Sequence, residues 1–238
     1  MRPETTITVN PWDRFAKEDP TFYIATHTRW RWREEDAFWR SGEQTVVHIW
    51  NVIERHLTAR RVAVEIGVGI GRLAVPMAKR FRRLKVVDRS RVMLEQLRIR
   101  CASHGACNVA SFHEDDAWDA EPMDFVYSAL TFQHVVDDAI IERYLTRVAA
   151  HLAGVAYLQF DTRPQNVFAR WRDHVPDRAL PRAWQGGMRR IRRRSSAIRE
   201  MFTRNILAVL EELNPESSLH AFVIARAPPP PPPVIDQR

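Results

Sequence analysis

Three glycines that alternate with apolar residues, directly after a short and mostly apolar run, constrain this fold more than any other feature. The run is Val62–Ile66, and the glycines are Gly67, Gly69 and Gly71. Such a run, ended by glycine, predicts a buried strand, and residues 73–81 predict a helix that begins just after the loop. Glycine permits positive φ and lets the backbone approach a ligand closely. A strand, a glycine loop and a helix in this order predict a ligand-binding α/β domain.

Strand-like and helix-like segments alternate from residue 62 to residue 160. Further strands are expected at residues 85–87, 109–112, 123–128 and 155–160, and helices at residues 91–101 and 137–152. This alternation predicts βαβ units with a mostly parallel sheet, which binds ligands at the carboxyl ends of its strands. Ile206–Leu213 and Leu219–Ala225 predict a closing antiparallel pair around Asn-Pro-Glu-Ser turn chemistry.

The chain is expected to divide into a cap, a main domain and a tail. Residues 1–58 form the aromatic-rich cap with the first helix, residues 59–227 the main domain, and residues 228–238 a disordered tail that contains six consecutive prolines. Residues 162–194, rich in arginine, are read as a segment inserted on the substrate side.

Serine residues are expected to cap two of the predicted helices. Ser41 is expected to cap an amphipathic helix of residues 43–57, and Ser195 or Ser196 a helix that ends near Arg204.

Composition excludes several classes of protein. Of the 238 residues, 45% are hydrophobic and 27% are charged, which is ordinary for a globular chain and excludes a wholly disordered one. Two cysteines are too few for a disulfide framework or a zinc ribbon. The sequence shows no secretory signal and no apolar stretch that could span a membrane, so a cytoplasmic protein is expected. The net charge of +7 raises nucleic acid as a partner.

Acidic residues beside the glycine loop indicate the chemistry of the ligand. Asp88 ends the next strand about 20 residues beyond the loop, where an ionised carboxylate accepts hydrogen bonds from both hydroxyls of a ribose. The dinucleotide fingerprint would need a small residue where Arg72 stands, and a Walker A loop is absent. With Glu65 adding a second acid, the site suits a cationic ligand, and a sulfonium with an amino-acid tail fits.

Three segments together resemble the class I S-adenosylmethionine-dependent methyltransferases. Residues 64–73 resemble the family's first motif, E/D-x-G-x-G-x-G, residues 86–94 its second motif, and residues 124–137 its fourth-strand segment, which ends in Gln-His-hydrophobic-x-Asp. The resemblance covers residues 40–160 well and the final hairpin loosely. It implies a Rossmann-like doubly wound sheet with a final antiparallel strand and a helical N-terminal cap. It also implies S-adenosylmethionine as methyl donor, with S-adenosylhomocysteine as product.

The resemblance assigns roles to the loop and to the next strand end. The backbones of the three glycines would line the methionine part of the cofactor, with Glu65 beside its amino group. Asp88 would hold the ribose hydroxyls, and Arg89 and Met93 would flank the adenosine. Arg72, which completes the motif, belongs to the same expected set.

Further roles fall after the third and fourth strands. The acid that ends the third strand would meet the adenine amino group; Asp116 fits this role best, with Ala117 beside it and Asp115 as the competitor. Ser128 and Leu130 would lie near the ribose and the sulfonium.

Catalytic candidates are fewer, because methyl transfer is an in-line displacement that depends chiefly on positioning. A general base helps where the nucleophile is a hydroxyl group; His134 is the first candidate and Asp161 the second. His134 has an alternative as a structural histidine that caps a helix or bonds the backbone. No cluster has metal-ligand spacing, so no metal is expected.

Aromatic and histidine side chains supply the candidates for the substrate side. They are Tyr23, Trp39, His174 and Trp184. The N-terminal aromatics have an alternative as the core of a small cap.

The arginine-rich segment of residues 182–199 leaves the acceptor open. It could contact phosphates, recognise an acidic small molecule, or form a solvated face. Methyl transfer to an O or N atom of a small-molecule acceptor is the leading hypothesis. An RNA methyltransferase and a non-catalytic cofactor-binding scaffold are the alternatives.

Overall fold

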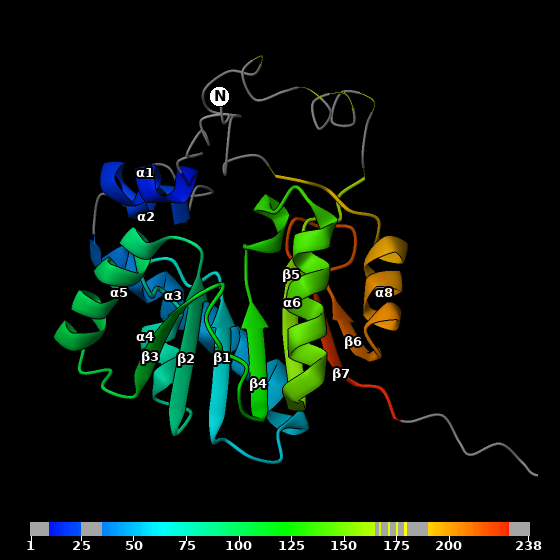
Figure 1. The fold of residues 1–238 in the computed structure, drawn as a ribbon, viewed down its shortest axis with the longest axis horizontal. Coiled ribbons are helices and arrows are strands. Elements are labelled where there is room, and N and C mark those ends of the chain that lie inside the picture. The colour runs from blue at the N-terminus through cyan, green and yellow to red at the C-terminus, as the bar shows by residue number, and fades with distance from the viewer. Residues whose placement is uncertain are drawn as a thin grey trace, which may run out of the picture.

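The strands of the chain form one mixed sheet. The computed structural model describes residues 10–24, 35–164 and 190–228, with positions 167, 171, 175 and 179 between them. Within these residues seven strands pair in the order β3-β2-β1-β4-β5-β7-β6 (Figure 1). The strands are β1 (Val62–Ile66), β2 (Arg83–Asp88), β3 (Val109–His113), β4 (Met123–Ser128), β5 (Leu152–Phe160), β6 (Leu207–Leu213) and β7 (His220–Arg226). The first five run parallel, and β7 enters antiparallel between β5 and β6, which confirms the expected fold class.

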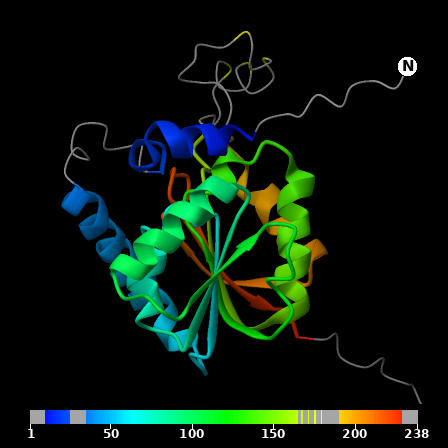
Figure 2. The ribbon, with the colours of Figure 1, turned by 60° about the vertical axis from the view of Figure 1, so that its left-hand side comes forward.

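Helices cover both faces of the sheet. They are α1 (Pro11–Glu18), α2 (Pro20–Ile24), α3 (Glu35–Ile53), α4 (Ala74–Ala78), α5 (Arg91–Ser103), α6 (Asp138–His151) and α8 (Ser195–Arg204), with the short 3-10 helices η2 (Glu54–His56) and η3 (Phe132–His134). Helices α3, α4 and α5 pack on one face, and α6 and α8 pack on the other (Figures 1 and 2).

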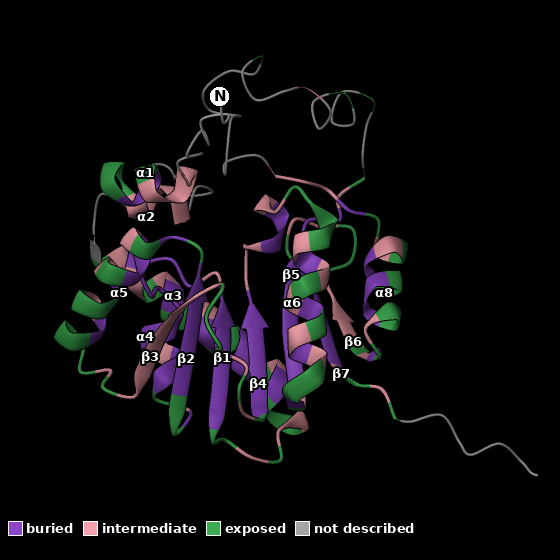
Figure 3. Cartoon of the chain, viewed as in Figure 1, coloured by how far each residue is buried: buried purple, intermediate pink, exposed green. Residues whose placement is uncertain are grey.

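Neighbouring residues of the central strands point into two different cores. Phe125 and Tyr127 join the core beneath α3, α4 and α5, whereas Val126 joins the core beneath α6 and α8. Strands β1, β2 and β4 are therefore buried on both sides (Figure 3), as their nearly continuous apolar runs predict.

The first long helix begins earlier than expected. Helix α3 begins at Glu35, so Ser41 lies inside it and donates its hydroxyl to the carbonyl oxygen of Phe38 instead of capping the helix. Gly42 lies where the helix crosses the glycine loop, and a Cβ on it would overlap the carbonyl oxygen of Arg72. A close approach of helix and loop, not a helix start, explains this Ser-Gly pair.

Helix α8 begins at Ser195 as expected, but the cap differs. Arg194 is its N-cap residue and makes no side-chain cap hydrogen bond. The prediction that Ser195 or Ser196 caps this helix with its hydroxyl is therefore wrong.

The N-terminal helices lie above the carboxyl ends of the strands (Figure 1). Helix α1 is tied to α5 and to the loop before it by three hydrogen bonds. Asn10 Nδ2 donates to Arg89 O (2.8 Å), Ser90 Oγ to Asp13 Oδ1 (2.6 Å) and Gln96 Nε2 to Ala16 O (2.7 Å). These bonds hold α1 over the edge of the sheet where parallel strands place their ligands.

None of the described helices combines the length and the apolar character needed to cross a bilayer.

Candidate active site

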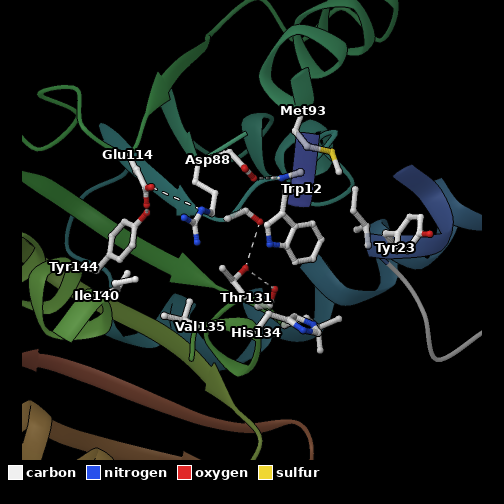
Figure 4. A pocket seen from close by; sticks show the side chains of 16 residues that line it. Trp12, Tyr23, Asp88, Met93, Glu114, Thr131, His134, Val135, Ile140 and Tyr144 are labelled. Atoms are coloured by element: carbon white, nitrogen blue, oxygen red, sulfur yellow. Dashed lines mark hydrogen bonds and ion pairs between the residues drawn. The ribbon is translucent and has the colours of Figure 1, made fainter. Parts of the chain in front are cut away.

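A pocket opens at the carboxyl ends of β1, β2 and β4, beneath α1 and α2 (Figure 4). The space between its walls, open mouth included, is ≈ 790 Å³. Its wall comes from the glycine loop, the ends of β2 and β3, the turn after β4, and helices α1, α2, α5 and α6. The lining residues are Trp12, Tyr23, Ile24, Gly67, Gly69, Asp88, Arg89, Met93, Glu114, Ala129, Leu130, Thr131, His134, Val135, Ile140 and Tyr144.

Two of the three glycines form the floor of this pocket. Gly67 and Gly69 have φ values of 78° and 56°. A Cβ on Gly67 would overlap the side chain of Thr131, and one on Gly69 would lie 2.7 Å from Ile24 Cδ1. Both conformation and space therefore require glycine here. Gly71 faces Leu97 of α5 and lies outside the lining.

Asp88 presents a buried carboxylate to the pocket. Its Oδ2 accepts a hydrogen bond from the backbone N–H of Gly69 (2.8 Å) and its Oδ1 one from that of Ser90 (2.9 Å). Each carboxylate oxygen keeps a lone pair for a further donor. Burial raises the pKa of Asp88 to about 6, and the two backbone donors oppose that rise. A ligand diol could therefore donate to both oxygens.

Glu114, the first residue after β3, supplies the second acid of the pocket. Tyr144 OH donates to Glu114 Oε2 (3.0 Å), and Arg89 Nε lies 3.8 Å from Glu114 Oε1 (Figure 4). Burial, together with the Glu114 carboxylate, raises the pKa of the Tyr144 hydroxyl. Asp116, expected in this role, is exposed and accepts the N–H of His113 (2.7 Å), and neither it nor Ala117 lines the pocket.

Glu114 could have been found in the sequence. It was missed because the strand was expected to end at Phe112 and the acid was sought four residues later. The strand extends to His113, so the first acid after it is the one that lines the pocket.

Two charged residues of the expected cofactor set lie below the glycine loop. Glu65 is 3% exposed and accepts the hydroxyl of Tyr127 (2.7 Å), and burial raises its pKa to about 8. Arg72 is buried too, which lowers its pKa, and its Nη1 donates to the hydroxyls of Ser41 and Thr45 (3.3 Å each). These contacts face α3 and the core, so neither residue lines the pocket, contrary to expectation.

Ser128 is also withdrawn from the pocket. Its hydroxyl donates to Ile66 O (3.0 Å) and so ties β4 to β1, with no surface exposed. Leu130, two residues later, does line the pocket, and its φ of 63° is unusual for a residue with a side chain.

The two expected general bases have different surroundings. His134, at the end of η3, lines the pocket and lies edge-on to the ring of Trp12, with centroids 5.7 Å apart. Asp161 is 1% exposed and is held by Arg163 through two bonds, Nε to Oδ1 (3.0 Å) and Nη2 to Oδ2 (2.5 Å). The carboxylate of Asp161 is thus paired and lies outside the pocket lining.

The substrate-side candidates separate in the same way. Tyr23 lines the pocket, and its hydroxyl donates to Glu18 Oε2 (2.8 Å). Trp39 packs against Phe38 and His104, away from the pocket. His174 and Trp184 lie outside the described residues.

The family model that matches this chain decides what the domain is. It is described as a methyltransferase domain and matches residues 63–154, from β1 to the first residues of β5. Residues 63–154 are a class I methyltransferase domain. No curated protein sequence matches the chain.

Several solved structures share the fold of most of this chain, including the parts outside residues 63–154. An S-adenosylmethionine-dependent methyltransferase from Clostridium acetobutylicum ATCC 824 has a TM-score of 0.60 at 11% identity, covering 87% of this chain and 99% of that one. Magnesium protoporphyrin IX methyltransferase from Synechocystis PCC 6803, with bound S-adenosylmethionine, has a TM-score of 0.59 at 14% identity, covering 90% and 95%. Mitomycin 7-O-methyltransferase has a TM-score of 0.57 at 16% identity, covering 91% and 60%.

The expectation of S-adenosylmethionine as methyl donor agrees with these findings. The Synechocystis enzyme is also known with bound S-adenosylhomocysteine, the demethylated product. Among the described residues of the present chain, no three His, Cys, Asp or Glu side chains group closely enough to hold a metal ion.

Proposed function

We propose that this chain transfers the methyl group of S-adenosylmethionine to an O or N atom of a small-molecule acceptor. One observation carries the proposal: a single pocket has the glycine backbones at its floor, the Asp88 carboxylate beside them and α1 and α2 above. The bound cofactor supplies an electrophilic methyl group on its sulfonium. The residues of the chain hold the cofactor, orient the acceptor and take up its proton.

The pocket wall fits the parts of the cofactor. Gly67 and Gly69 leave room for the methionine part, and Asp88 offers its carboxylate to the ribose diol. Glu114 accepts hydrogen bonds, as an adenine amino group requires of its partner, while Met93 supplies apolar surface nearby. In this proposal Glu114 takes the role that the sequence suggested for Asp116.

His134 is proposed as the general base. It lies on the pocket wall beside Trp12, where an imidazole nitrogen could accept the proton of a hydroxyl or amine acceptor. Tyr23 and Trp12, on the two N-terminal helices, would close the acceptor side and exclude water.

Two observations favour a small molecule over RNA as the acceptor. First, of the five arginines between residues 190 and 199, all but the exposed Arg194 make interactions within the chain. They are therefore not free for a row of phosphate contacts. Second, α1 and α2 cover the pocket, which suits an acceptor of limited size; the named acceptor of the Synechocystis neighbour, a porphyrin, is also a small molecule.

Calorimetry with S-adenosylhomocysteine tests the cofactor site by comparing substitutions of two carboxylates that line the pocket with one of a carboxylate that does not. We expect Asp88→Ala to abolish measurable binding and Glu114→Gln to weaken it by about tenfold, the equivalent of one lost hydrogen bond at about 1.4 kcal/mol. Asp116→Asn, only two residues further along, should bind as the parent does. Equal binding by the parent and Asp88→Ala would refute the site, and weakening by Asp116→Asn alone would restore the sequence-based assignment.

A second measurement separates the three classes of function. The protein is incubated with methyl-labelled cofactor and either a small-molecule extract or total RNA. Label in the small-molecule fraction, lost in His134→Ala, is the expected result. Label in RNA would establish the RNA alternative, and cofactor binding without transfer to either would indicate a scaffold.

A further inference from the structure

The returning end of the arginine-rich insertion packs against the turn after β4, which forms part of the pocket wall. Ile191 N donates to Gln133 O (2.7 Å) in η3, and Arg193 N donates to Asp161 O (2.9 Å) at the end of β5. Arg192 Nη1 donates to Pro164 O (3.0 Å), which joins the outgoing and returning ends of the insertion. Residues 191–193 therefore lie between the turn after β4 and the end of β5.

Arg193 makes the central contacts of this arrangement. The residue is only 7% exposed. Its Nη1 donates to Phe132 O (3.1 Å), its Nη2 to Val135 O (2.6 Å), and its Nε to Asp138 Oδ1 (2.8 Å). One guanidinium thus binds both ends of the turn of residues 132–135 and the first residue of α6.

Only arginine can make this set of contacts. Its planar fork presents five N–H donors in fixed directions, whereas the lysine ammonium groups three donors on one nitrogen. Three acceptors on different sides of a buried cation also offset the cost of removing its charge from water.

The turn that Arg193 holds carries much of the active-site wall. Residues 129–135 supply five of the sixteen lining residues, including Thr131, which packs on Gly67, and His134. Leu130 just before the turn has a positive φ, a strained conformation that persists only where surrounding contacts fix it.

We propose that Arg193 is a positioning residue for methyl transfer. It holds the turn of residues 132–135 so that Thr131 and Val135 meet the cofactor and His134 faces the acceptor, and it links the insertion to that turn. The expected effect of Arg193 on cofactor binding rests on the proposed function, whereas the contacts of Arg193 do not depend on that function.

The test compares Arg193→Lys with Arg199→Lys, a matched change in the same part of the chain. Arg199 makes a two-bonded pair with Glu212 (2.7 and 2.8 Å), and Glu212 accepts from the buried His220 (3.2 Å), so this variant perturbs a different histidine. Binding of S-adenosylhomocysteine is measured by calorimetry. The ring signals of His134 and His220 are followed by NMR on histidine-labelled protein and assigned with His134→Gln and His220→Gln.

We expect Arg193→Lys to raise the Kd of S-adenosylhomocysteine about tenfold and to shift the His134 signal, with His220 unchanged. Arg199→Lys should shift His220 and leave both His134 and the Kd unchanged. A general loss of stability would move both histidines, so this crossed pattern separates positioning from folding.

The proposal is overturned if Arg193→Lys leaves the His134 signal in place and the Kd within twofold of the parent. If that variant does not fold, Asp138→Ala, which removes one of the three acceptors, must still shift His134. If the parent itself binds no S-adenosylhomocysteine, the proposed function fails, while the His134 signal still decides the role of Arg193.

Discussion

Asp88 shows how one residue can serve both the fold and the ligand. Its carboxylate accepts the N–H groups of Gly69 and Ser90 and so joins the glycine loop to the start of α5. The same group faces the pocket, and burial raises its pKa to about 6. The charge available to a ligand should therefore change within an accessible range of pH.

Cofactor affinity should follow the ionisation of Asp88. The ribose hydroxyls donate hydrogen bonds, which the ionised carboxylate accepts better than the protonated acid does. Because the pKa is raised to about 6, the acid form dominates below that pH, and affinity is lost as the pH falls. We expect the Kd of S-adenosylhomocysteine, measured by calorimetry, to be constant above about pH 7 and to rise by up to about tenfold for each pH unit below 6.

The control for this prediction is Asp88→Asn, whose weaker binding should not change between pH 5 and pH 7. Glu65, with its pKa raised to about 8, is the competing titration. A transition centred near pH 8 that disappears in Glu65→Gln would assign the effect to Glu65 and contradict the prediction.

Single residues also show where reasoning from sequence was sufficient and where it was not. The spacing from the glycine loop placed Asp88 correctly at the end of its strand, because both lie in one local βαβ unit. Glu114 was missed because β3 ends at His113, one residue later than expected, and the acid was sought two residues beyond Glu114. Glu65 and Arg72 stand in the right motif, yet their partners on β4 and α3 turn them away from the pocket.

At the scale of elements, the local sequence pattern did not reveal the contact between α3 and the glycine loop. Arg72 reaches back to two hydroxyls of α3, and Gly42 lets the helix backbone approach the Arg72 carbonyl. The helix therefore supports the loop from below, while α1 and α2 cover the pocket from above.

Gly42→Ala should destabilise the protein although alanine favours helices over glycine by about 1 kcal/mol. The new methyl group would overlap the Arg72 carbonyl, and such overpacking costs about 1–3 kcal/mol. Urea unfolding should show a lower midpoint for Gly42→Ala. Glu43→Ala, on the exposed side of the same helix, should change it little. A Gly42→Ala protein as stable as the parent would show that the helix and the loop can move apart.

At the scale of the whole molecule, the pocket joins parts that are distant in sequence. Its wall extends from Trp12 in α1 to Tyr144 in α6, and the tie from Arg193 brings in the region beyond the insertion. A ligand that fills the pocket therefore contacts both halves of the parallel sheet.

Cofactor binding should consequently stabilise the fold as a unit. At 100 times its Kd, S-adenosylhomocysteine should add about 2.7 kcal/mol to the free energy of unfolding. For a chain of this length that corresponds to a rise of about 5–10 °C in Tm, measurable by calorimetric or fluorescence melting. Asp88→Ala should show no rise. Two results would contradict a pocket built across the whole sheet. One is a parent protein whose melting temperature does not change at saturating ligand, and the other is a melting curve with two transitions of which only one shifts.

The sequence by itself determined the alternation of strands and helices and the glycine loop, and the resemblance of its motifs to a known family implied the cofactor. The first two features are local: they follow from side-chain periodicity and from backbone conformations within a few residues. Only the tertiary structure decided that Glu114 and not Asp116 faces the pocket, that Asp161 is held by Arg163, and that Arg193 supports the turn before α6. Such outcomes depend on which partners packing brings within hydrogen-bond distance, and for Arg193 those partners lie 55 or more residues away in the chain.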